Sequence, residues 1–151
     1  MALFDQLKNR AQDLGEQLRT RKDQYRSREF ADASMAVCAL VATADGSLDP
    51  SERQRTAGLI VSNDTLSVFA PDDLRATFDR YCDKLTRDFD FGKVDAIAAI
   101  GTLRDKPDQA RAVIAIGLVI GHADGSFDAA ERKVVGEACH AVGIAPAEFD
   151  L

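Results

Sequence analysis

The chain has 151 residues, of which 46% are hydrophobic, and a formal net charge of -6. This length and composition fit one soluble globular domain, or two small repeats that share one core. The first 30 residues carry seven basic and five acidic side chains, whereas the remainder carries twelve basic and twenty acidic ones. An acidic body of this kind argues against nucleic-acid binding, which needs a basic surface, and suits cations or basic partners.

Two further features indicate a cytoplasmic protein. No apolar run is long enough to span a bilayer, and the N-terminus lacks the apolar core of a secretory signal. Cys38, Cys82 and Cys139 form an odd set without Cys-x-x-Cys spacing, which favours reduced, buried thiols over a disulfide framework or a thiolate zinc site.

Apolar residues recur at helical spacing almost throughout, which predicts an all-α fold of about seven or eight helices. The first predicted helix covers about residues 2–27. Its apolar stripe consists of Phe4, Leu7, Ala11, Leu14 and Leu18. Its second half is basic, as in a surface helix with cations near its negative end, or in a helix that docks on a partner or an anionic membrane. The interspersed acidic residues favour the surface helix.

The later helices are predicted over about residues 29–44, 50–62, 71–87, 93–104, 107–123 and 129–142, with a short helix near 64–69 and a closing turn at 144–151. The helices at 29–44 and 107–123 are apolar on most sides and are therefore expected in the centre. The aromatic residues assigned to the core are Phe69, Phe78, Phe89 and Phe91. Gly143 is the expected C-terminal stop of the 129–142 helix.

One segment of the chain occurs twice. Residues 44–53 read ADGSLDPSER, and residues 123–132, which lie 79 positions later, read ADGSFDAAER. Each copy follows a buried helix and precedes a surface helix. This context predicts an internal helix–loop–helix repeat with units of about 29–62 and 107–142, arranged as two helical bundles within a single domain of residues 1–151.

One interpretation of the repeated segment is helix capping alone. Asp49 would cap the following helix, and Glu52 would reach back to complete a capping box, as Asp128 and Glu131 would in the second copy. The glycines of both copies would end the preceding helices in a left-handed conformation. Capping leaves two residues without a role. They are Asp45 and Asp124, which are placed near the negative end of a helix, where an anion costs about 0.3–1 kcal/mol.

The other interpretation is cation binding. The pattern Asp-Gly-x-apolar-Asp-x-x-Glu is the second half of an EF-hand loop, but the two leading carboxylates of that loop are missing. We therefore expect a half-site in each loop, completed by water, backbone or the other loop, with one ion per loop. The predicted ligands are Asp45, Asp49, Glu52, Asp124, Asp128 and Glu131. Oxygen ligands favour Ca²⁺, with Mg²⁺ or another divalent ion as the alternative.

Other constellations give no convincing enzyme. Glu137 and His140 have the Glu-x-x-His spacing of di-iron bundles, but such sites need two copies. His122 flanks Asp124 and is interpreted as a bystander, because the first copy has Thr43 in its place. No serine lies in a catalytic context and no Gly-rich phosphate loop is present. A thiol- or metal-dependent enzyme stays as an alternative, which would need an exposed, activated cysteine.

With these motifs in place, the chain resembles the TerB family of tellurite-resistance proteins. The resemblance rests on Ala36-Val37-Cys38-Ala39, the two acidic loops, Phe89-Asp90-Phe91 and Pro146-Ala147-Glu148-Phe149. It implies an all-helical fold of two bundles related by an internal repeat, and a divalent-cation site formed by the six carboxylates named above. It also implies work with other tellurite-resistance proteins, including an integral membrane partner and calcium-binding companions.

The sequence therefore predicts a non-enzymatic, divalent-cation-binding helical adaptor of a bacterial tellurite- or stress-resistance system. It would be cytoplasmic, with the inner face of the cytoplasmic membrane as an alternative location, reached by peripheral association through the N-terminal helix. The competing hypothesis is a structural protein-interaction module whose acidic loops only cap helices and bind no metal.

Overall fold

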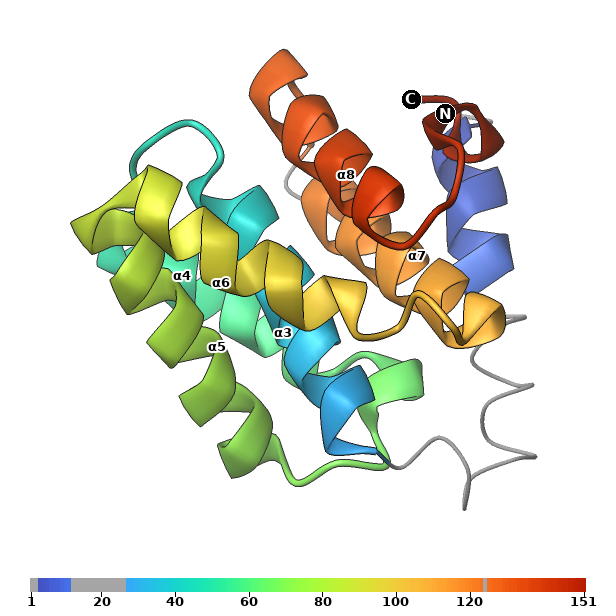
Figure 1. The fold of residues 1–151 in the computed structure, drawn as a ribbon. Helices are drawn as coiled ribbons and strands as arrows, with labels where there is room; N and C mark the ends of the chain where they lie inside the picture. The colour runs from blue at the N-terminus through green and yellow to red at the C-terminus, as the bar shows by residue number, and fades with distance from the viewer. Residues whose placement is uncertain (1–2, 12–26, 124) are drawn as a thin grey trace.

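The computed structural model describes residues 3–11, 27–123 and 125–151 (Figure 1). These residues contain seven α-helical segments, two 3-10 turns and no strand, which confirms the predicted all-α fold. The first predicted helix is described over residues 3–11 alone, so Leu14 and Leu18 lie outside the described residues. Among the described helices, none is both long enough and apolar enough to cross a bilayer.

The helices after residues 3–11 agree with the predicted ranges in most cases. They are α3 (Arg28–Thr43), α4 (Pro50–Val61), α5 (Pro71–Arg87), α6 (Phe89–Gly101), α7 (Pro107–Ala123) and α8 (Ala129–Ala141). The 3-10 turns are η1 (Asp64–Leu66) and η2 (Pro146–Phe149). The helix starts carry the expected chemistry, because the caps of α3, α4, α6 and α8 are a serine or an aspartate whose side chain accepts a backbone N–H of the first turn.

Helices α3 and α7 lie at the centre, as predicted. α3 contacts every helix from α4 to α8, and its residues from Ala33 to Leu40 are completely buried. α7 is buried on most sides in the same way. Figure 1 shows α5 on one side of α3 and α7 on the other, with α6 crossing in front. The buried face of α5 is formed by Leu74, Phe78, Tyr81, Cys82 and Leu85.

Helix α6 starts earlier than predicted. The expected range of about 93–104 treated Phe89 and Phe91 as a lead-in, but α6 spans Phe89–Gly101. The reason is a cap at Asp88. The Asp88 side chain accepts a hydrogen bond from the backbone N–H of Phe91 at 3.2 Å, so the helix can begin at once after α5.

The predicted core position of Phe91 is wrong, because its side chain is 75% exposed. The buried residues of α6 are Gly92, Ala96 and Ile100, which lie four positions apart on one side of the helix. Phe91 and Val94 therefore face outward. Val94 is 68% exposed. The described residues thus include two large apolar side chains that point into solvent from one helix.

Candidate functional site: the two acidic loops

The first acidic loop (residues 44–49) joins α3 to α4, and the second acidic loop (residues 123–128) joins α7 to α8. In each, a glycine has the expected left-handed backbone, with φ of +92° at Gly46 and +94° at Gly125. The N–H of Gly46 donates to the carbonyl of Thr43 at 2.9 Å, and that of Gly125 to the carbonyl of His122 at 3.0 Å. The two copies of the sequence therefore form the same helix ending.

Both predicted capping boxes are present. In the first loop, Asp49 Oδ1 accepts from the Glu52 N–H at 2.9 Å, and Glu52 Oε1 accepts from the Asp49 N–H at 3.2 Å. The corresponding distances for Asp128 and Glu131 are 2.8 and 3.1 Å. Four of the six predicted ligands thus already stabilise helix starts. The duplication of the entire helix–loop–helix unit stays a prediction, because these contacts concern the loops alone.

Capping accounts for more than the sequence indicated, because Asp45 also has a local role. It lies two residues beyond the end of α3, and its Oδ1 accepts a hydrogen bond from the Ser47 N–H at 3.1 Å. The expectation that capping leaves Asp45 without a role is therefore wrong. A short side chain that bonds its own backbone two residues on is a common turn device. Asp124 lies outside the described residues.

Hydrogen bonds in the first loop favour the ionised form of Asp49. A hydrogen bond from the Ser51 hydroxyl at 2.6 Å, together with the Glu52 N–H, lowers the pKa of Asp49 below its ordinary value. Each of Asp45, Asp49 and Glu52 uses one carboxylate oxygen in these bonds. Asp49 also receives the backbone N–H of Ser51. The bonds to Asp45 and Glu52 engage one oxygen of each, and the second oxygen of each carboxylate is of the kind that hard cations prefer.

The donor chemistry suits a hard cation, but the first loop does not gather its ligands. Over residues 3–11, 27–123 and 125–151, no three His, Cys, Asp or Glu side chains are placed to hold one ion. All three carboxylates of the first loop are within this range, so their side chains would have to turn toward one another around an ion. For the second loop the same test would need Asp124.

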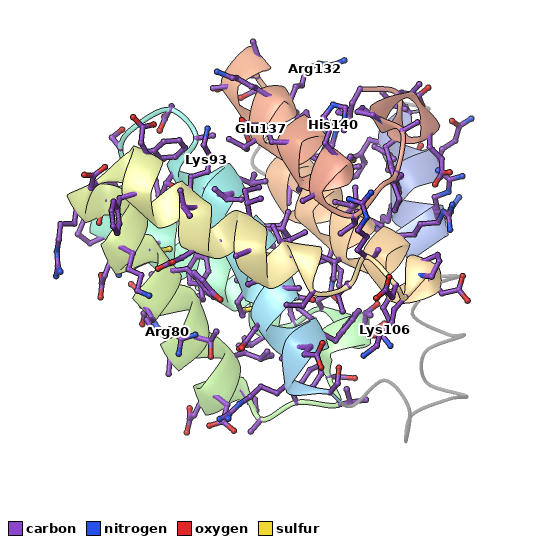
Figure 2. The ribbon with its side chains drawn as sticks, in the orientation of Figure 1. Arg80, Lys93, Lys106, Arg132, Glu137 and His140 are labelled. Carbon is purple, nitrogen blue, oxygen red and sulfur yellow. The ribbon has the colours of Figure 1, made fainter. Side chains whose placement is uncertain are left out.

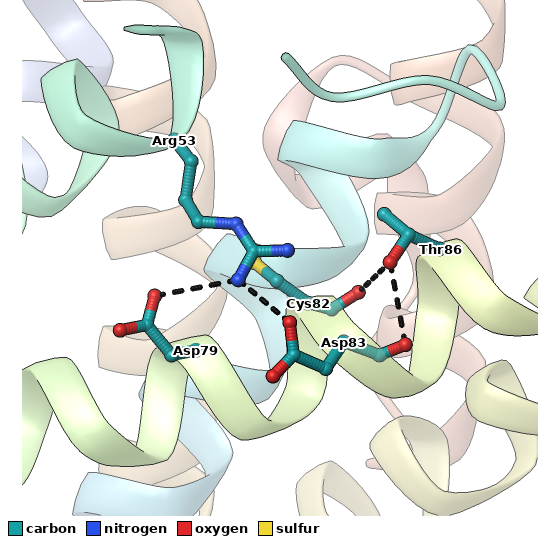
Figure 3. A network of polar contacts seen from close by, with 5 residues as sticks. All are labelled: Arg53, Asp79, Cys82, Asp83 and Thr86. Carbon is teal, nitrogen blue, oxygen red and sulfur yellow. Dashed lines mark hydrogen bonds and ion pairs between the residues drawn. The ribbon is translucent and has the colours of Figure 1, made fainter. Parts of the chain in front are cut away.

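The first loop is anchored to α5 by the arginine that follows Glu52. Arg53 Nη1 donates to Asp83 Oδ1 at 2.8 Å and lies 3.6 Å from Asp79 Oδ1 (Figure 3). Figure 3 also shows Cys82 between these two aspartates along α5, close to the guanidinium group. This ion-pair network ties the start of α4 to α5.

The second loop is anchored differently, through aromatic rings. The Phe127 ring stacks on the His122 imidazole with centroids 4.7 Å apart, and Phe4 meets the same imidazole edge-on at 5.5 Å. Gly121 leaves room for this stack, because a Cβ there would lie 3.0 Å from the Phe127 ring. Partial burial, with a smaller effect of Arg132, lowers the pKa of His122. His122 is thus a packing residue, and the signal for it was the exchange of Leu48 for Phe127 between the copies.

Of the two residues with Glu-x-x-His spacing, Glu137 has a structural role. Glu137 Oε2 lies 3.0 Å from Lys93 Nζ, so this pair joins α8 to α6 (Figure 2). Lys93 also lies over the Phe89 ring, 5.8 Å from its centroid. Glu137 therefore serves a helix–helix contact.

The three cysteines are buried, as predicted. Burial raises the pKa of Cys82 to about 12 and that of Cys139 to about 11, and it raises the pKa of Cys38 further. Such thiols stay protonated at neutral pH, whereas nucleophilic chemistry needs the thiolate.

In a comparison with known proteins, the sequence model of the family described as "Tellurite resistance protein TerB" matches residues 31–151 of this chain. The chain belongs to the TerB family. The matched part includes both acidic loops and the C-terminal segment around Glu148, whereas residues 3–11 lie outside it. Membership of the TerB family supports a role related to tellurite resistance.

One curated relative is also similar to this chain over most of its length. The tellurium resistance protein TerB of Alcaligenes sp. is 26% identical over 118 residues, which cover 78% of this chain and 97% of the relative. No solved structure matches this TerB-family chain significantly.

Proposed function

We propose that the protein is a non-enzymatic, divalent-cation-binding helical adaptor in a bacterial tellurite- or stress-resistance system. Family membership supports the resistance role. The cation part is carried by one observation, which is that both copies of the acidic sequence form the same left-handed glycine and the same capping box. The buried, protonated thiols support the absence of thiol chemistry.

The electrostatics of the first loop favour a bound cation. Asp45 and Asp49 are exposed, Glu52 is half-buried, and the hydrogen bonds to Asp45 and Glu52 engage one oxygen of each. Two unit charges 4 Å apart near a protein surface repel by roughly 4 kcal/mol, so gathering them is favourable only around a cation. Asp45, Asp49 and Glu52 would hold one ion, and Asp124, Asp128 and Glu131 a second. Ca²⁺ fits such oxygen ligands best, with Mg²⁺ or another divalent ion as the alternative.

The proposed adaptor works with other tellurite-resistance proteins in the cytoplasm, including an integral membrane partner. The N-terminal helix is the proposed element for peripheral association at the inner face of the membrane, because it carries an apolar stripe and basic residues. The acidic body supports contacts with cations and basic partners and disfavours nucleic acid.

The test is an NMR titration with Ca²⁺, Mg²⁺, Mn²⁺ and Zn²⁺, which follows the amide signals of Gly46 and Gly125. One cation should shift both signals in the wild type, and the double variant Asp45→Asn/Asp124→Asn should bind it at least tenfold more weakly. The matched control is Asp72→Asn/Asp105→Asn, which removes the same charge elsewhere and should bind like the wild type. Equal responses in wild type and loop variant would remove the loops from the mechanism.

A second candidate function is a structural interaction module without metal. Two observations favour it, namely the complete capping of the first loop and the exposed Phe91 and Val94 on α6. In this case no divalent salt changes the melting temperature, and a Phe91→Ser/Val94→Ser variant keeps its fold but loses binding to partners.

A further inference from the structure

We infer that the N-terminal helix (residues 3–11) is a latch that the second acidic loop holds closed through the stacked rings of Phe127, His122 and Phe4. The helix lies beside α7 and the C-terminal turn in Figure 1. Its opening would expose the apolar stripe that the proposed adaptor uses to meet another surface, and in this respect the inference rests on the proposed function.

The first contact is the aromatic one. His122 lies in the last turn of α7 and packs against two rings, one from a residue near the N-terminus and one from the loop that follows α7. Phe127 of the second loop stacks on it at 4.7 Å and 22°, and Phe4 of the N-terminal helix meets it at 5.5 Å and 62°. Because the imidazole contacts both rings, a displacement of Phe127 changes the surface on which Phe4 packs.

The second contact holds the other end of the helix and does not involve the loop. Arg10 Nη1 donates to the carbonyl of Glu148 at 2.8 Å, and its guanidinium lies 5.1 Å from the centroid of the Phe149 ring. The Glu148 carboxylate is itself held by Arg111 of α7, with Nε–Oε2 at 2.7 Å and Nη2–Oε1 at 3.3 Å. These contacts hold the Arg10 end without the second loop, so the second loop acts on the helix through Phe4.

The closed latch hides the apolar side of the helix. Leu7 is 4% exposed and Ala11 is 8% exposed, so both belong to the core of the protein. A helix that already packs its apolar stripe on its own body cannot place the same stripe on a membrane or a partner. The helix therefore has to lift before it can act as a docking element.

The first acidic loop provides an internal control, because it lacks both aromatic elements. Thr43 takes the place of His122, and its hydroxyl donates to the Ala39 carbonyl at 2.8 Å inside the core. Leu48 takes the place of Phe127. The first loop is tied to α5 instead of the N-terminal helix, so a substitution in it reports a general loss of stability and not an effect of the rings.

The test is native-state hydrogen exchange at the amides of residues 7–11, measured without divalent ions. Phe127→Leu and His122→Thr each give the second loop the side chain of the first. An aromatic pair contributes about 0.5–1.5 kcal/mol, so exchange at residues 7–11 should rise about 2- to 12-fold while exchange in α3 is unchanged. Leu48→Ala should leave residues 7–11 as in the wild type. Unchanged exchange in Phe127→Leu, or an equal rise in Leu48→Ala, would overturn the latch.

A calcium chloride titration of the same samples separates the latch from the proposed function. If the second loop binds Ca²⁺, exchange at residues 7–11 should rise in the wild type with the midpoint of the Gly125 signal. In Phe127→Leu the Gly125 signal should still titrate while residues 7–11 no longer respond. If a titrating Gly125 signal leaves residues 7–11 unaffected in the wild type, the latch is wrong. If no divalent ion shifts either loop, the cation proposal fails and the ion-free comparison alone decides the latch.

Discussion

The two acidic loops share a left-handed glycine and a capping box, and they differ in their neighbours. Both end a helix with a left-handed glycine and start the next with a complete capping box. The first loop is then tied to α5 by the charges around Arg53, whereas the second is tied to the N-terminal helix by the rings around His122. The repeated motif thus specifies the same caps and glycine turn twice, while the helices that surround each copy decide what that copy can influence.

The largest effects should come from the glycines that both loops share. Gly46→Ala and Gly125→Ala should each lower the free energy of unfolding by about 1–3 kcal/mol, because a Cβ at positive φ is strained even where space is free. Urea unfolding measures this. Gly58→Ala in α4 is the control, since its Cβ meets nothing within 4 Å, and it should be neutral or stabilise by about 0.5–1 kcal/mol. A harmless Gly125→Ala beside a costly Gly46→Ala would show that the loops are not equivalent.

The caps should give the next largest effect, again equal in both loops. Asp49→Ala and Asp128→Ala should each cost about 1 kcal/mol of stability in metal-free buffer, because each removes the acceptor of a first-turn N–H. Asn is also a good cap, so Asp49→Asn should cost only a few tenths of that. Thermal and urea unfolding measure these losses of stability. If Asp49→Asn destabilised the protein as much as Asp49→Ala, the assignment of Asp49 as a cap would be wrong.

The smallest effect concerns the pH dependence of the Arg111–Glu148 ion pair. The hydrogen bonds from Arg111 lower the pKa of Glu148 below its ordinary value of 4.5. The unfolded state therefore binds a proton first, so the stabilisation is complete above pH 4.5 and is lost as the pH falls through the folded-state pKa. Because the side chains of Arg111 and Glu148 are 37% and 32% exposed, solvent screens the pair and the effect should stay below about 1 kcal/mol.

The corresponding experiment compares wild type and Glu148→Gln by urea unfolding between pH 7 and pH 3. The variant should be slightly less stable at pH 7, and the difference should shrink toward pH 3. A difference that grows on acidification would have the wrong sign for a carboxylate with a lowered pKa.

Local chemistry carried the successful predictions. The helix starts, the left-handed glycines and the two central helices follow from spacing and capping residues, all of which act within a few positions of the chain. The start of α6 differs from the prediction because Asp88, directly after α5, caps it. Phe91 is exposed, although it is hydrophobic, because Gly92, Ala96 and Ile100 set the buried side of α6.

Long-range contacts were the part that the sequence could not supply. The stack of Phe4, His122 and Phe127 joins opposite ends of the chain, and Arg53 finds its partners on another helix. No spacing rule links such positions. Among the six predicted ligands, Asp49 and Asp128 form the predicted caps, and Asp45 forms a turn that the sequence did not predict. Cation binding itself stays a prediction.

The most direct measurement is calorimetric titration of the wild type and of Asp45→Asn/Asp49→Asn with calcium chloride. Asn keeps the cap of α4 but removes two negative ligands from the first loop. The account predicts two ions per chain in the wild type and one in the variant. An unchanged number of sites, or no binding of Ca²⁺, Mg²⁺, Mn²⁺ or Zn²⁺ by the wild type, would contradict it.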